Sequence, residues 1–167
     1  MKRRILFYIL ALIFFCSISA MAIAGPKGCK LQGSWYGTGD ITLLTTYNGM
    51  SANFGTIIEE LPGFDMTFGG TYPDVVEGTT LRGTWQRTGG NTFVFTQLAY
   101  GLDAVGNIIY KVKNSGTKTL SDDCNSMEVL STIEFYGPED DPFAGPGFCM
   151  ELDPISVYRM MIDPPCE

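Results

Sequence analysis

The chain contains no histidine, and this restricts the chemistry that its side chains can perform. Ser-His-Asp and Cys-His nucleophile systems are excluded, as are zinc sites that use histidine. Acid–base catalysis would have to come from carboxylates, tyrosines, lysines or cysteines. Glu59 and Glu60 cannot pair for glycoside chemistry, because adjacent residues of a strand point to opposite faces. The sequence therefore indicates no catalytic residue and no cofactor, and an enzyme is the less favoured class.

Two acidic clusters contain the oxygen ligands that calcium prefers. They are Asp122-Asp123-Cys124-Asn125 and Glu139-Asp140-Asp141. Neither has the twelve-residue spacing of an EF-hand loop. Asp and Asn are also common turn residues, because their side chains hydrogen-bond to the nearby backbone. We therefore interpret both clusters as turns and predict no metal site.

The first 24 residues have the features of a secretory signal peptide. Residues 2–4 are basic, residues 5–15 are apolar, and Ala22-Ile23-Ala24 places small residues before a cleavage site. Cleavage there removes three of the 11 basic residues and none of the 18 acidic ones, so eight against 18 leaves a net charge of −10. That charge argues against nucleic acid as a partner. We expect residues 25–167 to be one secreted or periplasmic domain with no stable membrane insertion, and the oligomeric state is open.

The elements that must position any site are strands. After residue 25, no window has helical spacing of apolar residues that Gly or Pro does not interrupt. Segments rich in Thr, Val, Ile, Phe and Tyr alternate with Gly, Asn, Asp and Pro, which is typical of all-β sandwiches and barrels. Short hairpin signals such as Asn48-Gly49 and Gly89-Gly90 favour an antiparallel up-and-down meander. We predict eight strands, at about 33–47, 53–59, 64–70, 80–87, 91–101, 107–120, 125–136 and 150–161.

Alternation along these segments gives each strand one apolar face. Met127, Val129, Ile133 and Phe135, for example, share one face of the seventh strand. Eight such strands close into a barrel whose interior either packs solid or holds one small ligand. Aromatic residues at inward positions suit an apolar pocket, although the same pattern is typical of plain core. The candidate ligand-binding residues are Tyr47, Phe54, Phe68, Phe95, Tyr110 and Phe135.

Gly33-Ser34-Trp35, at the start of the first predicted strand, resembles the G-x-W signature of the lipocalin and calycin barrels. In these families the Trp closes one end of the barrel, and a basic residue late in the chain packs over it. The resemblance implies that Arg159, in the last predicted strand, stacks on Trp35. It also implies a calycin-like barrel that binds a small hydrophobic molecule.

A second likeness covers about residues 80–137. Gly83-Thr84-Trp85-Gln86-Arg87-Thr88-Gly89, with Asp103-Ala104-Val105-Gly106-Asn107 further on, resembles small exported bacterial calycin-like proteins of unassigned activity. The chain lacks the C-terminal helix of lipocalins and their usual motif at the turn between the sixth and seventh strands. The resemblance therefore supports the barrel more strongly than a transport role.

Three functions are compatible with this barrel. We expect an exported protein that binds a small hydrophobic molecule in its interior. One alternative is an isomerase of the allene-oxide-cyclase type, which pre-shapes an apolar substrate with few catalytic groups. The other is a protein-interaction or inhibitor module that uses residues 137–148. That segment, stiffened by three prolines, is also the predicted lid over the open end of the barrel.

Four cysteines follow the signal segment: Cys29, Cys124, Cys149 and Cys166. In an exported chain they indicate two disulfides. The predicted meander places Cys29, Cys124 and Cys166 at the end with Trp35. Cys149 is predicted to lie at the other end, together with the loops 48–52, 71–79, 102–106 and 137–149. Because a disulfide needs Cα atoms within about 7 Å, we predict Cys29–Cys124, together with Cys149–Cys166 if the tail doubles back. A Cys29–Cys166 bond is the alternative that the same meander allows.

Overall fold

The computed structural model describes residues 28–37 and 42–161, and every regular element in these ranges is a β-strand. The predicted signal peptide and Cys166 lie outside the described residues. Within these ranges no helix is long and apolar enough to cross a membrane. The strands are β1 (Gly33–Gly37), β2 (Leu43–Gly49), β3 (Phe54–Glu60), β4 (Glu77–Gly78), β5 (Leu81–Gly89), β6 (Thr92–Leu102), β7 (Ile108–Leu120), β8 (Ser126–Tyr136), β9 (Phe148–Glu151) and β10 (Ile155–Arg159).

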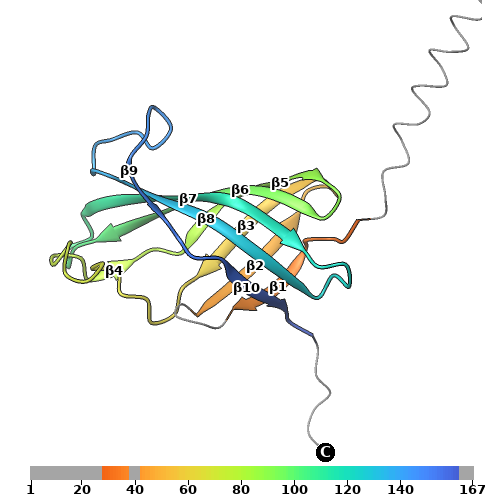
Figure 1. The fold of residues 1–167 in the computed structure, drawn as a ribbon. Helices are drawn as coiled ribbons and strands as arrows, with labels where there is room; N and C mark the ends of the chain where they lie inside the picture. Colours follow the sequence, from red (N-terminus) through yellow and green to blue (C-terminus); the bar gives the residue numbers. More distant parts are fainter. Residues whose placement is uncertain (1–27, 38–41, 162–167) are drawn as a thin grey trace, which may run out of the picture.

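Eight of these strands form a closed antiparallel barrel (Figure 1). Neighbours pair in the order β1, β2, β3, β5, β6, β7, β8 and β10, and β10 pairs with both β8 and β1. The two short extra strands extend the sheet, since β4 pairs with β6 and β9 with β8. The predicted all-β class, the antiparallel meander and the eight-stranded barrel are therefore confirmed.

Two of the predicted strands are wrong and a third is interrupted, although eight strands form the barrel as predicted. The predicted strand 150–161 is divided by residues 152–154 into β9 and β10. The predicted strand 33–47 is two strands, because β1 and β2 pair with each other and Gly37 lies opposite Leu43. The predicted strand 64–70 is a series of turns. There, Asp65 accepts hydrogen bonds from the backbone of Thr67 and Gly69, and these local bonds replace strand pairing.

Because β1 and β2 are separate strands, the loop after β2 lies at the opposite end of the barrel from the one predicted for residues 48–52. Residues 50–53 lie at the Trp35 end, where Gln32 donates a hydrogen bond to the carbonyl of Ser51. The connection that starts at Leu61 belongs to the other end and runs through β4 to β5 (left in Figure 1).

Tight coiling of the sheet depends on inward-facing glycines. A Cβ on Gly83 would overlap the carbonyl oxygen of Thr96, and one on Gly116 would overlap that of Leu130. Glycine lets the neighbouring backbone approach there, which a strongly bent strand requires. These positions therefore contribute to the curvature that closes the sheet.

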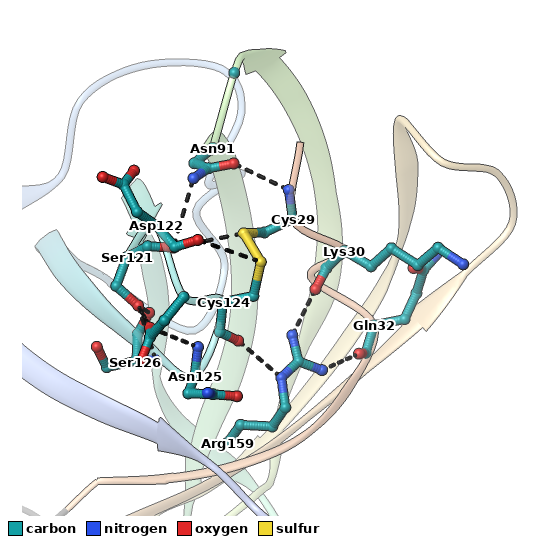
Figure 2. Close-up of a disulfide and its surroundings, with 12 residues drawn as sticks. Cys29, Lys30, Gln32, Asn91, Ser121, Asp122, Cys124, Asn125, Ser126 and Arg159 are labelled. Carbon is teal, nitrogen blue, oxygen red and sulfur yellow. Dashed lines mark hydrogen bonds between the residues drawn. A yellow bond between two sulfur atoms is a disulfide. The ribbon is translucent and has the colours of Figure 1, made fainter. Parts of the chain in front are cut away.

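At the Trp35 end, Arg159 donates hydrogen bonds to the backbone of three other residues (Figure 2). Trp35 is fully buried, and the Arg159 guanidinium lies 4.2 Å from the centre of its ring, as the resemblance implies. The guanidinium also donates to the carbonyls of Lys30, Gln32 and Cys124 at 2.6, 2.9 and 3.0 Å. Arg159 thereby joins the segment before β1, the turn before β8 and the end of β10.

A disulfide reinforces the same end. Cys29 and Cys124 are bonded across 95 residues, with Cα atoms 5.4 Å apart, so the first predicted pairing is confirmed. In the chain-entropy model a loop of that length contributes about 4–5 kcal/mol. Cys149 is exposed at the start of β9 and has no cysteine partner among the described residues. Because Cys166 lies outside those residues, the Cys149–Cys166 bond stays a prediction.

We expect Arg159→Ala to lower the free energy of unfolding by about 2–4 kcal/mol, because it removes the cation–π contact and three hydrogen bonds to carbonyls. Chemical unfolding followed by circular dichroism measures this change. Arg159→Lys should recover only part of the loss, since an ammonium cannot reproduce the planar fork. Arg82→Ala, which removes an exposed arginine from the outer face of β5, is the matched control. Equal losses for Arg159→Ala and Arg82→Ala would contradict the role of Arg159.

Candidate functional site

The interior of the barrel holds a cavity of about 340 Å³. It lies between two separate groups of buried side chains, and it is lined by members of both. Leu43 and Val129 belong to the group at the Trp35 end, whereas Val112 and Ile133 belong to the aromatic group at the other end. Of the two predicted interiors, solid or hollow, the structure shows one that is packed at both ends and hollow between them.

The segment between β3 and β5 forms one wall of the cavity. Eight of the 20 lining residues come from positions 61–80, among them Phe64, Met66 and Phe68. The Tyr110 hydroxyl donates to the carbonyl of Met66 at 2.8 Å and ties this segment to β7. Phe68 adopts a positive φ of 50°, which is unfavourable for a bulky residue. That backbone conformation directs its ring against Tyr110 and Phe135.

Asp65 fixes the turn that carries these residues. Its carboxylate accepts hydrogen bonds from the Thr67 hydroxyl at 2.6 Å and from two backbone amides. These hydrogen bonds lower the pKa of Asp65, and the bond from the Thr67 hydroxyl has the largest effect. The ionised carboxylate is therefore the form that holds the wall in place.

The segment 137–148, the predicted lid, contributes no residue to the cavity lining. It is bound to the outer face of the barrel instead. Lys111 donates to the carbonyl of Asp140 at 2.7 Å, and Lys113 donates to that of Pro142 at 3.0 Å. Lys113 also forms an ion pair with Glu134 at 2.6 Å, and this contact raises the pKa of Lys113 and lowers that of Glu134. The structure therefore corrects the lid assignment.

The floor of the cavity is polar. Glu59 lines it, and the Glu59 carboxylate accepts a hydrogen bond from Thr45 at 2.8 Å and pairs with the Lys118 ammonium at 3.3 Å. The ammonium also donates to the Tyr47 hydroxyl and lies 4.3 Å from the centre of the Phe95 ring. Both charged side chains are almost fully buried.

Burial of this group shifts its proton equilibria. Loss of solvation lowers the pKa of Lys118, against the opposing effect of Glu59. Burial, followed by the negative charge of Glu59, raises the pKa of Tyr47 well above its ordinary value. Tyr47 is therefore a neutral hydrogen-bonding partner of the ion pair.

Two buried amides, Asn114 and Gln97, lie opposite each other on β7 and β6. Asn114 lines the cavity and donates to the Gln97 carbonyl oxygen across 3.4 Å. The other polar atom of each amide, Asn114 Oδ1 and Gln97 Nε2, is buried and has no hydrogen-bond partner among the described residues. Such atoms are rare in folded proteins, because leaving them unpaired costs about 1–3 kcal/mol each.

The six predicted ligand-binding aromatics occupy different places. Phe68 lines the cavity, and Tyr110 and Phe135 pack against it. Tyr47 and Phe95 surround Lys118 below the floor. Phe54 is 48% exposed and faces outward, because Gly55, Ile57 and Glu59 are the inward residues of β3. Its predicted interior position is therefore wrong, and a ligand-binding role for the others stays a prediction.

The acidic clusters act as turns, as expected. Asp123 accepts hydrogen bonds from Ser121 and from the Asn125 backbone, and Asp141 accepts one from the backbone of Phe143. Within residues 28–37 and 42–161, no group of three or more Cys, Asp or Glu side chains is arranged to hold a metal ion.

Sequence reasoning missed the polar floor, although alternation contained a signal for it. Gln97 shares the inward face of β6 with Phe93 and Phe95, and Asn114 and Lys118 share that of β7. A polar residue at an inward position indicates either a buried network or a site. Its pairing partners lie on other strands and do not follow from spacing alone.

No protein-family model, no curated protein and no solved structure matches this chain. The fold is thus shown by the strand pairing itself, which is consistent with a calycin-like barrel.

We expect Lys118→Met to lower the free energy of unfolding by about 3–5 kcal/mol, because it leaves Glu59 buried without its cation. Lys113→Met is the matched control, since this lysine pairs with Glu134 on the outer face, where an ion pair contributes about 1 kcal/mol or less. Adding Glu59→Gln to Lys118→Met should restore part of the stability. Urea unfolding of the single and double variants gives the coupling energy, and a double loss equal to the sum of the singles would contradict the pairing.

We expect Tyr110→Phe to weaken the alkaline sensitivity of the fold. Burial raises the pKa of Tyr110 to about 12, above the value of about 10 for an unfolded tyrosine. The stability that this group contributes is therefore complete below about pH 10 and is lost as the pH rises towards 12. Urea midpoints between pH 8 and pH 11.5 should fall less steeply in Tyr110→Phe than in the wild type. Tyr158→Phe on the outer face is the control, and parallel slopes in all three proteins would refute the assignment.

Proposed function

We propose that this protein is an exported binding protein that holds one small, mainly apolar molecule in the cavity of its barrel. The observation that carries the proposal is the cavity between the two packed groups. Its volume is at the lower end of the range for small-molecule sites, roughly 300–1,000 Å³. Its lining is mainly apolar with a smaller number of polar groups, which is the usual composition of such sites.

Binding in the cavity should have a measurable effect on stability. A molecule that fills this space in the folded protein and does not bind the unfolded chain stabilises the folded state, so binding should raise the unfolding temperature.

Export is the second part of the proposal. The disulfide between Cys29 and Cys124 fits an oxidising compartment. The basic and apolar residues 1–15 give the chain a signal for reaching it. The periplasm or the extracellular space would both satisfy this argument. The isomerase and interaction-module alternatives have no comparable observation in their favour.

The neutral fluorescent probe N-phenyl-1-naphthylamine tests the cavity. We expect the protein to bind one molecule per chain, with increased emission and a higher unfolding temperature. Ala99→Leu enlarges a buried side chain that lines the cavity from β6. This variant should weaken probe binding at least tenfold without lowering the stability of the free protein.

Val94→Leu is the matched control, because Val94 lies on the outer face of the same strand. Its probe affinity should equal that of the wild type. Equal affinities in Ala99→Leu and the wild type would show that the probe binds elsewhere, and the proposal would fail.

A further inference from the structure

We propose that the cavity selects an uncharged molecule with one hydrogen-bond-donating head group, such as a long-chain alcohol or primary amide, and binds it with the head against Asn114 and Glu59. This inference rests on the proposed function and specifies its ligand class. The observation behind it is the set of polar atoms without a partner among the described residues at Asn114 and Glu59, two of the residues that line a mainly apolar cavity.

The two amides provide the first part of the argument. Asn114 and Gln97 lie directly opposite each other on β7 and β6 and share one hydrogen bond. An amide pair joined by a single bond leaves one donor and one acceptor unused, whichever way each amide is turned. Both residues are more than nine-tenths buried, and Asn114 lines the cavity. A donor group on a ligand would satisfy the unpaired Oδ1 of Asn114, which is the amide of the two that lines the cavity.

Glu59 provides the second part. Both hydrogen bonds that its carboxylate accepts go to Oε2, from Thr45 and Lys118. No described residue donates to Oε1, so the carboxylate retains acceptor capacity where it lines the cavity. The positive charge that balances it is already present in Lys118. The floor is therefore neutral as a whole but rich in acceptors on the side of the cavity.

These features rank the possible head groups. A hydroxyl or a primary amide donates a hydrogen bond to the acceptors and can accept one from an amide. An ether accepts but does not donate, and it leaves the acceptors of the floor unpaired. A carboxylate also has no hydrogen to donate to these acceptors, and it places a second negative charge beside Glu59 in a poorly solvated space. The order of affinity is therefore alcohol and amide first, ether next and carboxylate last.

The cavity, with a volume of about 340 Å³, is in the size range of sites for small molecules. Compounds with chains of about twelve carbon atoms are therefore suitable test ligands.

Displacement of N-phenyl-1-naphthylamine by four compounds of matched length tests the ranking. They are dodecan-1-ol, dodecanamide, undecyl methyl ether and dodecanoate, each titrated at pH 7.5 below its aggregation limit. We expect the alcohol and the amide to displace the probe at concentrations roughly tenfold lower than the ether, and the ether to be more effective than the carboxylate.

Asn114→Leu should remove the advantage of the alcohol over the ether, measured as the ratio of their displacement concentrations within the same variant. Gln86→Leu, which removes an exposed amide from the outer face of β5, should leave the ranking unchanged. If Asn114→Leu fails to fold, the ranking in the wild type still decides the question.

The two proposals fail in different ways. If alcohol and ether displace the probe equally in the wild type while Ala99→Leu blocks the probe, the head-group selection is wrong and the cavity remains the binding site. If Ala99→Leu leaves probe binding unchanged, the proposed function itself is wrong.

Discussion

The contact between Arg159 and Trp35 determines which end of this barrel is closed. A meander of eight strands becomes a barrel only if its last strand pairs with its first, and Arg159 lies opposite Trp35 in that pairing. Its guanidinium satisfies carbonyls from three segments and covers the indole at 4.2 Å. The Cys29–Cys124 bond lies at the same end. Because this end is packed and cross-linked, interior space is left only further along the axis.

The buried ion pair sets the depth of that space. Glu59 and Lys118 lie between the packed end and the cavity, and their desolvation limits what they contribute to stability. An apolar pair of the same volume would fill the interior at least as favourably. The charged pair instead gives the cavity a polar floor, which an apolar pair would not provide. The unpaired atoms of Gln97 and Asn114 add to the same floor.

The sequence was sufficient for the class of fold and insufficient for the site. Alternation identified the inward faces of β6, β7 and β8, and the meander placed Cys29 beside Cys124. The alternation argument failed at residues 64–70, where Phe64, Met66 and Phe68 alternate as in a strand. The chain forms turns there instead, because Asp65 accepts hydrogen bonds from the nearby backbone and Phe68, Gly69 and Gly70 have positive φ. The floor was missed because its partners come from β2, β3, β6 and β7, and pairing between side chains on different strands is decided by register.

The two ends of the barrel are stabilised by different kinds of interaction. A disulfide and a multiply bonded arginine hold the closed end, and these contacts link segments far apart in the chain. The wall formed by residues 61–80 is held by hydrogen bonds within its own turns, by the Tyr110 hydroxyl and by backbone bonds to β6 around the two-residue strand β4. Segments held by few long-range contacts open at lower free energy than paired strands. We therefore expect this wall to open more readily than the barrel strands, and its displacement would leave every strand pair of the eight-stranded barrel intact.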